Sequence, residues 1–565
     1  MRPLAALLCG ALLSAGCTDL VSHGRDDPAL EWARRYPVVP APATLRPARG
    51  EFVLDGSTRL LLADPADPEV RSVAELLAAP LRAASGFPLP VSAAPASGPE
   101  RNALVLRLAA ELPGDSPERY RLSVTEQGAV LAAATPAGLF RGTQTLRQLL
   151  PPAVEEAVRA RADWRGIAPA RASTGRARWA VPAVEIEDAP RFAYRGMHLD
   201  VARHFMPPEF VKKYVDLLAL YRFSHFHWHL TDDQGWRIEI RKHPRLTEVG
   251  AWRRETMVGR LGAAAGDGRP HGGFYTQAEV RDIVAYAAAR HVTIVPEIEM
   301  PGHARAAIAA YPELSCSGAP VEVATGWGIH ADVLCPSERT FAFLEDVLDE
   351  VMELFPGPYV HVGGDEVRKE QWAESPVARE VMRREGLAGV EALQTYFVGR
   401  VGRYLEAQGR RYVGWDEIAQ GGIPPGAVVM SWRGMLPGID AARRGHEVIM
   451  APDTHLYFDH YQANPASEPL GIGNVIPLRV VYDFDPVPPD LGPGERERVL
   501  GGQGSVWTEH LRTPGEVEYM AFPRVIALSE ALWTPVERRS WKSFQERLPA
   551  QLRRLDALGV RYRAP

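Results

Sequence analysis

Beyond residue 190 the sequence alternates between short apolar runs and longer helical patterns, and this alternation most limits the possible folds. Two helices are clear: residues 209–221 have apolar side chains at helical spacing, and residues 276–290 begin with Thr276 and Glu279 in capping-box spacing. Eight strand-then-helix units predict a (β/α)8 TIM barrel, whose active site lies at the carboxyl ends of the strands. The eight apolar runs lie at 194–200, 225–230, 292–298, 358–364, 411–416, 427–432, 446–452 and 501–508.

A second domain is expected because the chain has 565 residues, and a single core stops growing at ~250–300. Over residues 37–188 short apolar runs alternate with Ala-rich helical stretches, including a strand at 120–124 and a helix at 137–150. The chain is therefore predicted to be an α/β protein with a smaller α+β domain at 37–188. The catalytic barrel and a C-terminal helix should occupy 189–565. Within the smaller domain, the Pro-, Ala- and Arg-rich segment 151–180 predicts a surface insertion and linker.

Residues 1–17 have the composition of an export signal. Arg2 precedes an apolar stretch from Leu4 to Leu13, and small residues stand directly before Cys17. That arrangement resembles a bacterial lipobox, in which Cys17 would be the lipidated N-terminus; simple secretion is the alternative. We expect an exported protein, either a cell-envelope lipoprotein of the periplasm or outer membrane or a secreted one. A membrane would be a partner only through that lipid anchor.

Export bears on the two cysteines in the body of the chain, Cys316 and Cys335. In an oxidising compartment two free thiols tend to pair, so a disulfide and two buried free thiols both remain open. The formal net charge of −6 is small and no basic block is present, so nucleic acid is not an expected partner.

The fourth apolar run ends in two glycines followed by two adjacent carboxylates, Gly363-Gly364-Asp365-Glu366. Neighbouring strand residues point to opposite faces, so both carboxylates serve one ligand only if the strand stops and the chain turns, as glycines permit. Adjacent carboxylates repel when both are ionised, which favours an acid beside a base. The alternative is an exposed pair opening the next helix, where negative charge suits the helix dipole.

Polar and aromatic residues also follow the other predicted strands. Tryptophan rings offer flat faces to the apolar side of a sugar ring, and arginine and carboxylates bind hydroxyls in fixed directions. The rim therefore predicts a carbohydrate site. Its residues include Arg203, Asp232, Glu297, Glu299, His303, Trp415, Asp416, Glu417, Trp432, Tyr457, Asp459, Trp507 and Glu509.

From about residue 37 onward the chain resembles the glycoside hydrolase family 20 β-N-acetylhexosaminidases. His361 to Glu366 matches the family signature His-x-Gly-Gly-Asp-Glu, and segments 200–204, 227–236, 296–303 and 507–509 match further motifs in order. The resemblance implies an exo-acting retaining enzyme that removes terminal GlcNAc or GalNAc from chitooligosaccharides or glycoconjugates. It also implies that no metal and no cofactor takes part.

Family 20 enzymes use their substrate as the nucleophile. The 2-acetamido oxygen attacks C1 and forms an oxazolinium intermediate. By resemblance, Glu366 protonates the leaving oxygen and later activates water, whereas Asp365 binds the acetamido N–H and balances the developing positive charge.

The resemblance also assigns roles to the rim. Tyr457 would bind the acetamido oxygen. Three rings would form the walls of the pocket, namely Trp415, Trp432 and Trp507. Three side chains would bind the distal hydroxyls, namely Arg203, Asp459 and Glu509. Asp232 and His303 would support the acid/base; the alternative for these two is a structural pair at the barrel rim.

The sequence also suggests two other functions, a metal-dependent hydrolase and a glycan-binding lectin. His227-Trp228-His229 imitates the metal pair of barrel amidohydrolases, but the fifth and sixth runs end in Trp415-Asp416 and Ser431-Trp432 instead of further histidines. A metal site is therefore not expected. A surface lectin that binds glycans without cutting them is the remaining alternative, although a binder has no need of an acid at Glu366. Loops 259–273 and 459–489 cannot be placed from the sequence.

Overall fold

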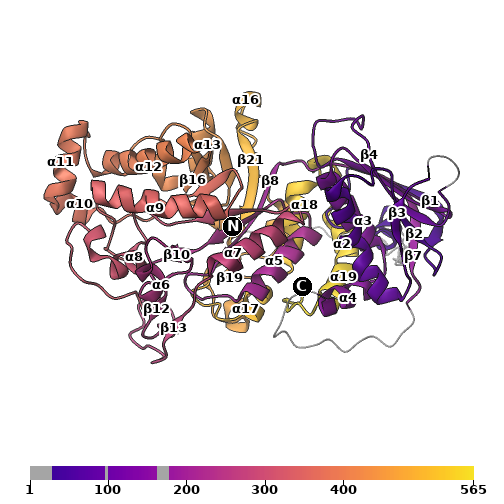
Figure 1. The fold of residues 1–565 in the computed structure, drawn as a ribbon, viewed down its shortest axis with the longest axis horizontal. Coiled ribbons are helices and arrows are strands. Elements are labelled where there is room, and N and C mark those ends of the chain that lie inside the picture. The colour runs from indigo at the N-terminus through magenta and orange to yellow at the C-terminus, as the bar shows by residue number, and fades with distance from the viewer. Residues whose placement is uncertain (1–27, 96–99, 162–176) are drawn as a thin grey trace, which may run out of the picture.

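The computed structural model describes residues 28–95, 100–161 and 177–565 (Figure 1). Eight parallel strands close into a barrel in the order β14-β15-β16-β17-β18-β21-β8-β9. Each predicted strand is present, and the prediction of a (β/α)8 barrel is confirmed. The strands are β8 (Tyr194–Asp200), β9 (His225–His229), β14 (Thr293–Glu297), β15 (Tyr359–His361), β16 (Arg411–Trp415), β17 (Val428–Ser431), β18 (Val448–Met450) and β21 (Val499–Gly504).

Among the described residues, a helix of eight or more residues follows six of the eight barrel strands, whereas the fifth strand, β16, and the seventh, β18, are followed only by shorter helices. The two helices predicted from sequence are confirmed, and Thr276 and Glu279 form the expected capping box. Between β16 and β17 the chain forms only the short 3₁₀ helix η2 (Asp416–Ala419), because Gly421, Gly422 and the Pro424-Pro425 pair disfavour a longer one. The covering helices are α5 (Pro208–Leu220), α7 (Gln277–Ala288), α9 (Glu338–Leu354), α12 (Val390–Ala407), α13 (Leu436–Arg443) and α18 (Arg524–Trp533).

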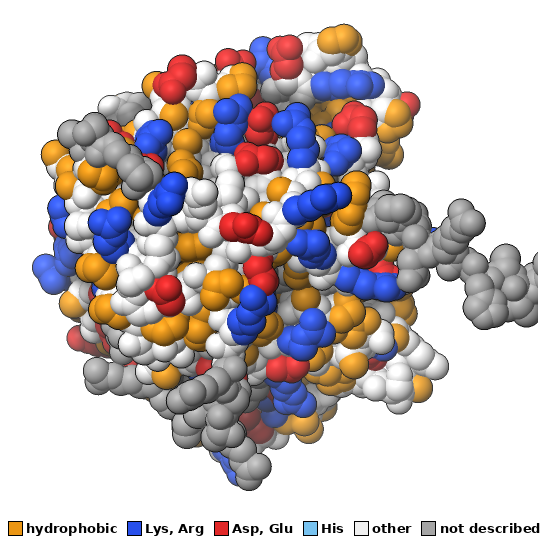
Figure 2. All heavy atoms as spheres, turned by 90° about the vertical axis from the view of Figure 1, so that its right-hand side faces the viewer, with side chains coloured by type: hydrophobic (Ala, Val, Ile, Leu, Met, Phe, Trp, Pro, Cys, Tyr) orange, Lys and Arg blue, Asp and Glu red, His pale blue; other side chains and the backbone are white. Residues whose placement is uncertain are grey.

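The N-terminal domain is a seven-stranded mixed sheet in the order β1-β7-β5-β6-β4-β2-β3. Helices α2 (Pro68–Ser85) and α3 (Pro136–Leu149) pack against the sheet, and in β5 the buried residues alternate with exposed ones such as Arg121. On the outer side of this domain, acidic and basic side chains are interspersed (Figure 2). The strands are β1 (Thr44–Val53), β2 (Arg59–Leu62), β3 (Val91–Ala93), β4 (Ala103–Leu108), β5 (Tyr120–Thr125), β6 (Gly128–Ala133) and β7 (Ala180–Asp188).

The prediction of a linker at 151–180 is wrong for the first part of that segment. Residues Ala153–Arg161 form helix α4, which follows two prolines and buries Val154 and Glu155. Ala, Glu and Arg are good helix formers, and proline is favoured at the start of a helix. Residues 162–176 lie outside the described residues.

A long C-terminal helix, α19 (Trp541–Leu558), packs against α4 and against α1 (Pro28–Arg35) at the N-terminal side of the molecule (Figure 1). Arg554 Nη1 donates to Glu155 Oε1 at 3.0 Å, and Arg147 forms a second ion pair with Glu155. The side chain of Glu155 is fully buried. The ion pair therefore joins the end of the barrel domain to the N-terminal domain.

Replacing Glu155 by glutamine is expected to destabilise the protein. The substitution leaves the buried Arg554 without its charged partner, and breaking a buried pair in this way costs about 3–5 kcal/mol. The free energy of unfolding, measured in urea, should fall accordingly. Glu380→Gln is the matched control because Glu380 pairs with Arg383 on the exposed face of α11 (Pro376–Glu385). Equal stability of the two variants would contradict this prediction.

Residues 1–17, where we expect the export signal and Cys17, lie outside the described residues. Within the described ranges, no helix combines the length and the apolar character needed to cross a membrane.

Candidate active site

Asp365 and Glu366 follow β15, where the strand stops and the chain turns. Gly363 and Gly364 have φ angles of 63° and 94°, which glycine adopts readily. A Cβ at Gly363 would lie 1.9 Å from Glu299 Oε2, and one at Gly364 would lie 2.4 Å from Ile418 Cγ2. Both glycines are therefore required for the turn that presents the two carboxyl groups at one rim.

The backbone of Glu366 is itself strained, with φ 50°. Positive φ is uncommon for residues other than glycine, and such strain concentrates at functional sites. The side chain of Glu366 is 32% exposed, whereas that of Asp365 is 12% exposed. Glu366 therefore faces the opening of the site, and Asp365 lies deeper.

His303 lies behind this carboxylate pair and touches both members. Its Nε2 is 3.4 Å from Glu366 Oε2 and 3.6 Å from Asp365 Oδ2, while Nδ1 is 3.2 Å from Asp232 Oδ1 and 3.1 Å from Asp233 Oδ2. Burial disfavours the charged ring, but Asp232 and Asp365 outweigh it and raise the pKa of His303 well above its usual value. His303 therefore carries a positive charge next to the pair.

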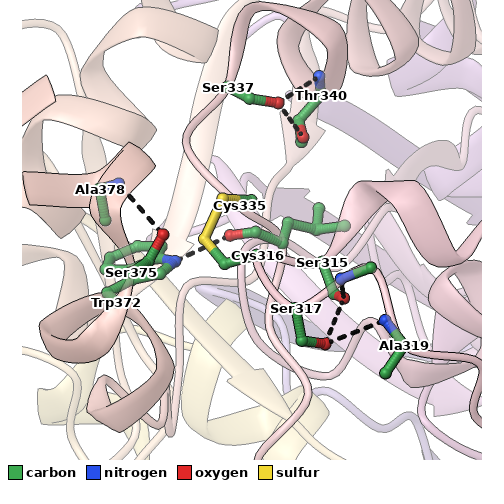
Figure 3. Close-up of a disulfide and its surroundings, with 12 residues drawn as sticks. Ser315, Cys316, Ser317, Ala319, Cys335, Ser337, Thr340, Trp372, Ser375 and Ala378 are labelled. Carbon is green, nitrogen blue, oxygen red and sulfur yellow. Dashed lines mark hydrogen bonds between the residues drawn. A yellow bond between two sulfur atoms is a disulfide. The ribbon is translucent and has the colours of Figure 1, made fainter. Parts of the chain in front are cut away.

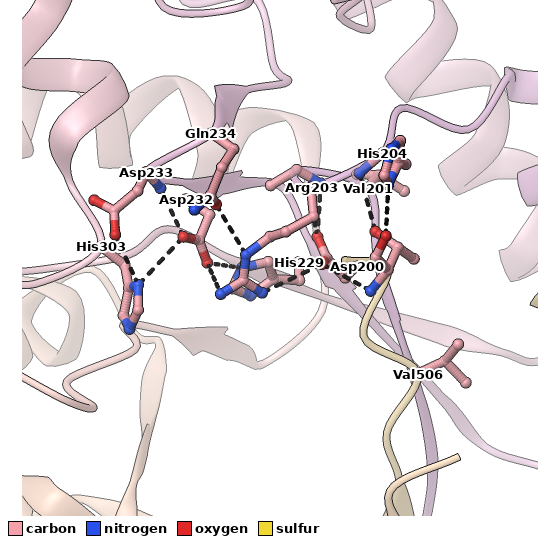
Figure 4. A network of polar contacts seen from close by, with 12 residues as sticks. Asp200, Val201, Arg203, His204, His229, Asp232, Asp233, Gln234, His303 and Val506 are labelled. Carbon is pink, nitrogen blue, oxygen red and sulfur yellow. Dashed lines mark hydrogen bonds and ion pairs between the residues drawn. The ribbon is translucent and has the colours of Figure 1, made fainter. Parts of the chain in front are cut away.

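Asp232 joins His303 to two further cations (Figure 4). Arg203 Nη2 lies 2.9 Å from Asp232 Oδ2, and His229 Nε2 lies 2.9 Å from the same oxygen. Arg203 is also held by Asp200 Oδ2 at 3.2 Å and by Gln234 Oε1 at 3.0 Å. Burial acts to raise the pKa of Asp232, but Arg203 and His303 lower it well below its usual range.

Glu297 is the inner end of the same network. Its carboxylate lies 3.0 Å from His227 Nε2 and 2.8 Å from His361 Nδ1, accepts a hydrogen bond from Trp415 Nε1 at 2.8 Å, and hydrogen-bonds to His229 Nδ1. Burial acts to lower the pKa of His229, yet Glu297 and Asp232 raise it to about 10. Negative and positive charges therefore alternate along this network. The carboxylates of Glu297 and Asp232 flank the His229 cation, and the His303 cation lies between Asp232 and the Asp365-Glu366 pair.

Sequence reasoning did not assign Glu297 or His229 a role. A signal was present, because the two residues end neighbouring strands and are paired in the register of β9 and β14. Glu297, His198 and His227 have metal-ligand spacing, as do Asp232, Asp233 and His303. The hydrogen bonds and ion pairs described above already satisfy Glu297 and Asp232.

The predicted aromatic residues form one continuous wall. Trp432 stacks on Tyr457 with ring centroids 6.0 Å apart and an interplanar angle of 16°. Tyr457 lies 6.1 Å from Trp507, and Trp507 lies 5.8 Å from Trp415. These rings come from the carboxyl ends of β16, β17, β18 and β21, so the barrel brings all four together.

Three residues predicted to bind distal hydroxyls lie at the same rim. Arg203 Cζ sits 4.9 Å from the Trp507 ring centroid. Asp459 Oδ1 and Glu509 Oε2 are buried and receive no hydrogen bond from any described residue. Burial is the main cause that raises the pKa of Asp459 and of Glu509, each to about 7. Two buried acceptors and a guanidinium suit the hydroxyl groups of a sugar.

Two further buried carboxyl groups, Glu299 and Glu417, stand at this rim. Burial and the charge of Asp365 raise the pKa of Glu299 well above its usual value. Glu417 accepts a hydrogen bond from Trp432 Nε1 at 2.9 Å. The sequence places both residues at strand ends, but nothing in it indicates their partners.

Cys316 and Cys335 form a disulfide (Figure 3), so the first of the two alternatives is the one present. The loop that it closes rests on the site. Leu334 N donates to Pro301 O at 2.9 Å, and Ala324 N donates to Asp233 O at 3.0 Å. The disulfide loop thus supports the turns that carry His303 and Asp233.

The loops that the sequence could not place both border this rim of the barrel. Strand β12 (Trp252–Arg253) pairs with β13 (His271–Gly272), and Arg253 Nη2 donates to Arg203 O at 2.7 Å. Segment 459–489 packs against α18 through α15 (Leu478–Asp483). Within the first loop, His271 Nε2 accepts a hydrogen bond from Phe205 N at 3.2 Å, two residues beyond Arg203, and the second loop begins at Asp459.

A cavity of about 870 Å³ lies at the opposite end of the barrel, next to the N-terminal domain. His225, Thr293 and Pro358 line it from the starts of the strands, and Glu118 and Arg141 line it from the smaller domain. Catalytic groups of such barrels occupy the other end, so we assign this cavity to the domain interface.

Comparison with known proteins agrees with this geometry. The family model for the glycosyl hydrolase family 20 catalytic domain matches residues 192–536, and that for domain 2 of the family matches residues 35–189. A beta-hexosaminidase of Porphyromonas gingivalis is 41% identical over 537 residues, which are 95% of this chain and 65% of that protein. A beta-hexosaminidase of Vibrio furnissii is 38% identical over 418 residues, 73% of this chain and 64% of that protein. This chain therefore covers just under two thirds of the length of these two relatives.

Solved structures show the same fold over nearly the full length. The GH20 beta-N-acetylhexosaminidase from Streptomyces coelicolor A3(2) has a TM-score of 0.79 and 34% identity, over 94% of this chain and 98% of that one. A Streptomyces plicatus beta-hexosaminidase variant in complex with its product GlcNAc has a TM-score of 0.78 and 35% identity, over 94% and 97%. The barrel and the smaller domain thus both match, and the chain belongs to glycosyl hydrolase family 20.

Proposed function

We propose that this protein is an exo-acting retaining β-N-acetylhexosaminidase that removes terminal GlcNAc or GalNAc from the non-reducing end of glycans. The observation that carries the proposal is the Asp365-Glu366 pair, turned into one rim by two glycines, with His303 behind it and the aromatic wall beside it. Chitooligosaccharides and glycoconjugates supply such sugars. The Streptomyces plicatus relative holds GlcNAc as its product, which supports this choice of sugar.

The proposed reaction has two steps. The substrate's 2-acetamido oxygen attacks C1 while the bond from C1 to the leaving oxygen breaks, and Glu366 gives its proton to that oxygen. This forms an oxazolinium ion, whose positive charge Asp365 balances while it holds the acetamido N–H. Water then attacks C1 and gives a proton to Glu366, while the bond from C1 to the acetamido oxygen breaks, so the anomeric configuration is retained.

The remaining residues hold the sugar in the orientation that this attack requires. Tyr457 binds the acetamido oxygen, inside walls formed by Trp415, Trp432 and Trp507. The distal hydroxyls are bound by Arg203, Asp459 and Glu509. Asp232 and His303 support the carboxylate pair through the contacts described above. Because the substrate supplies the nucleophile, no metal or cofactor is required.

The direct test is release of p-nitrophenol from a p-nitrophenyl β-GlcNAc glycoside by the wild-type protein. Hydrolysis that persists after treatment with a chelator is the expected result. If the protein binds GlcNAc in calorimetry but releases no p-nitrophenol, the lectin alternative is correct. If the chelator abolishes hydrolysis, a metal takes part and the proposed chemistry is wrong.

Activity is expected to fall on the acid side below a pH of about 6. Burial and the neighbouring Glu366 raise the pKa of Asp365 to about 6, although His303 opposes them. The mechanism needs Asp365 ionised, so protonation should lower kcat/KM by about tenfold for each pH unit below that value. The acid limb of the pH profile is obtained by measuring kcat/KM from pH 4 to 8. A profile that stays flat down to pH 4.5 would contradict the role of Asp365.

We also propose that the protein is exported and anchored by a lipid at Cys17, on the composition of residues 1–17. Labelled palmitate should then enter the wild-type protein but not the Cys17→Ser variant when each is made in a bacterial host. Export of an unlabelled wild type would favour simple secretion, and label in both proteins would show that a residue other than Cys17 carries the lipid.

A further inference from the structure

Glu417 is a buried carboxyl group in the aromatic wall with no role in the proposed mechanism. It lies in η2, directly after β16, and is 6% exposed. We infer that Glu417 is a positioning residue, whose carboxyl group fixes the indole ring of Trp432 as a wall of the sugar pocket. The inference rests on the proposed function, because that proposal places Trp432 against the substrate.

The side chains of Asp416 and Glu417 both accept hydrogen bonds from the segment that follows β17. Asp416 Oδ2 accepts hydrogen bonds from the backbone N–H of Trp432 at 2.9 Å and of Arg433 at 3.1 Å. Glu417 Oε2 accepts one from the Trp432 indole N–H at 2.9 Å. Asp416 therefore fixes the main chain, and Glu417 fixes the direction of the ring.

The orientation of this ring matters because Trp432 is only half-buried. One side of the indole stacks on Tyr457 with an interplanar angle of 16°. Tyr457 in turn contacts Trp507. If the indole loses its acceptor, the ring gains rotational freedom, and Tyr457, the proposed ligand of the acetamido oxygen, loses its stacking partner.

Glu417 also adjoins the reacting groups. Its neighbour Ile418 packs within 2.4 Å of the position that a Cβ on Gly364 would take, immediately before Asp365. The charged groups that face Glu417 are Asp365, Asp416 and Arg433, whose Nε lies 3.5 Å from Glu417 Oε1. Any movement of η2 is therefore transmitted to the turn that carries the catalytic pair.

The charge state of Glu417 fits this position. Burial, Asp365 and Asp416 raise its pKa to about 8, against Arg433 and the indole hydrogen bond. A carboxyl group accepts the indole hydrogen bond through one oxygen whether or not it carries a proton. A glutamine offers the same acceptor without a charge, which makes Glu417→Gln the informative conservative variant.

The test compares kcat and KM of four variants on the p-nitrophenyl substrate. Glu417→Ala and Trp432→Phe, which remove the acceptor and the donor, should each lower kcat/KM by about tenfold, equivalent to about 1.4 kcal/mol. The double variant should also be about tenfold below wild type, since both changes break one interaction. Glu417→Gln should restore kcat/KM to within about threefold of wild type.

Additive losses in the double variant, near a hundredfold, would overturn the inference, and so would an unimpaired Glu417→Ala. A glutamine variant as poor as the alanine variant would also overturn it, because charge instead of hydrogen bonding would then matter. Thermal unfolding of each variant checks folding. If the alanine variant does not fold, Glu417→Met keeps the bulk without an acceptor and takes its place. Failure of the proposed function differs from all these outcomes, because the wild type itself would not hydrolyse the substrate.

Discussion

Glu366→Gln should lower kcat on an unactivated substrate such as chitobiose by about 10²- to 10⁴-fold, the usual contribution of a general acid and base. An amide can hydrogen-bond the leaving oxygen but cannot give it a proton. The loss should be smaller on p-nitrophenyl β-GlcNAc, because nitrophenolate leaves without full protonation. Steady-state kinetics on both substrates therefore give a ratio that only the acid role predicts.

Glu370→Gln is the matched control for this substitution. Glu370 begins α10 (Glu370–Glu374), is exposed and pairs with Arg368. Its activity on both substrates should equal that of the wild type. If Glu366→Gln hydrolyses chitobiose without loss, Glu366 is not the acid/base.

Asp365→Asn is expected to lower kcat by about 10²- to 10³-fold, as removal of a group that stabilises transition-state charge commonly does. Asparagine keeps the shape of the side chain but cannot balance the charge of the oxazolinium ion. The loss should be similar for chitobiose and for the p-nitrophenyl substrate, because both form the same oxazolinium ion, whichever group leaves. This pattern distinguishes Asp365 from Glu366.

The residual activity of Asp365→Asn gives a second readout. Its pH profile should lack the acid limb near pH 6, because the group whose pKa lies there has been removed. A variant with wild-type kcat, or one that keeps the limb unchanged, would show that another group titrates and that Asp365 does not orient the substrate. Calorimetric binding of GlcNAc by the variant checks that the pocket is intact.

Most of the barrel could be predicted from local patterns. Parallel strands buried on both faces leave continuous apolar runs, and their helices leave a separate 3.6-residue period, so the eight runs corresponded to the eight strands. Helix α4 was missed because the prolines and arginines around it suggest a loop, whereas its burial depends on α19, which lies far along the chain. Tertiary packing overrode local composition there.

The sequence predicted which residues lie at the carboxyl ends of the strands, but not which of their side chains contact one another. The barrel rule places Asp365, Trp415 and Glu509 at one rim. The position of His303 between four carboxylates depends on side-chain directions in turns that the sequence does not specify. The sequence could not decide between a disulfide and two free thiols for the same reason. Pairing requires Cys316 and Cys335 to approach, and in the structure their Cα atoms are 4.7 Å apart.

The packing of α19 against the N-terminal domain determines when that domain can finish folding during synthesis. Arg554 donates to Glu155, to Gln148 O and to Leu150 O, across 399 to 406 residues of chain. A ribosome produces the N-terminal domain first, and its buried acceptors receive these donors only after 399 to 406 further residues have been made. The first domain therefore reaches its final packing only when α19 has joined it.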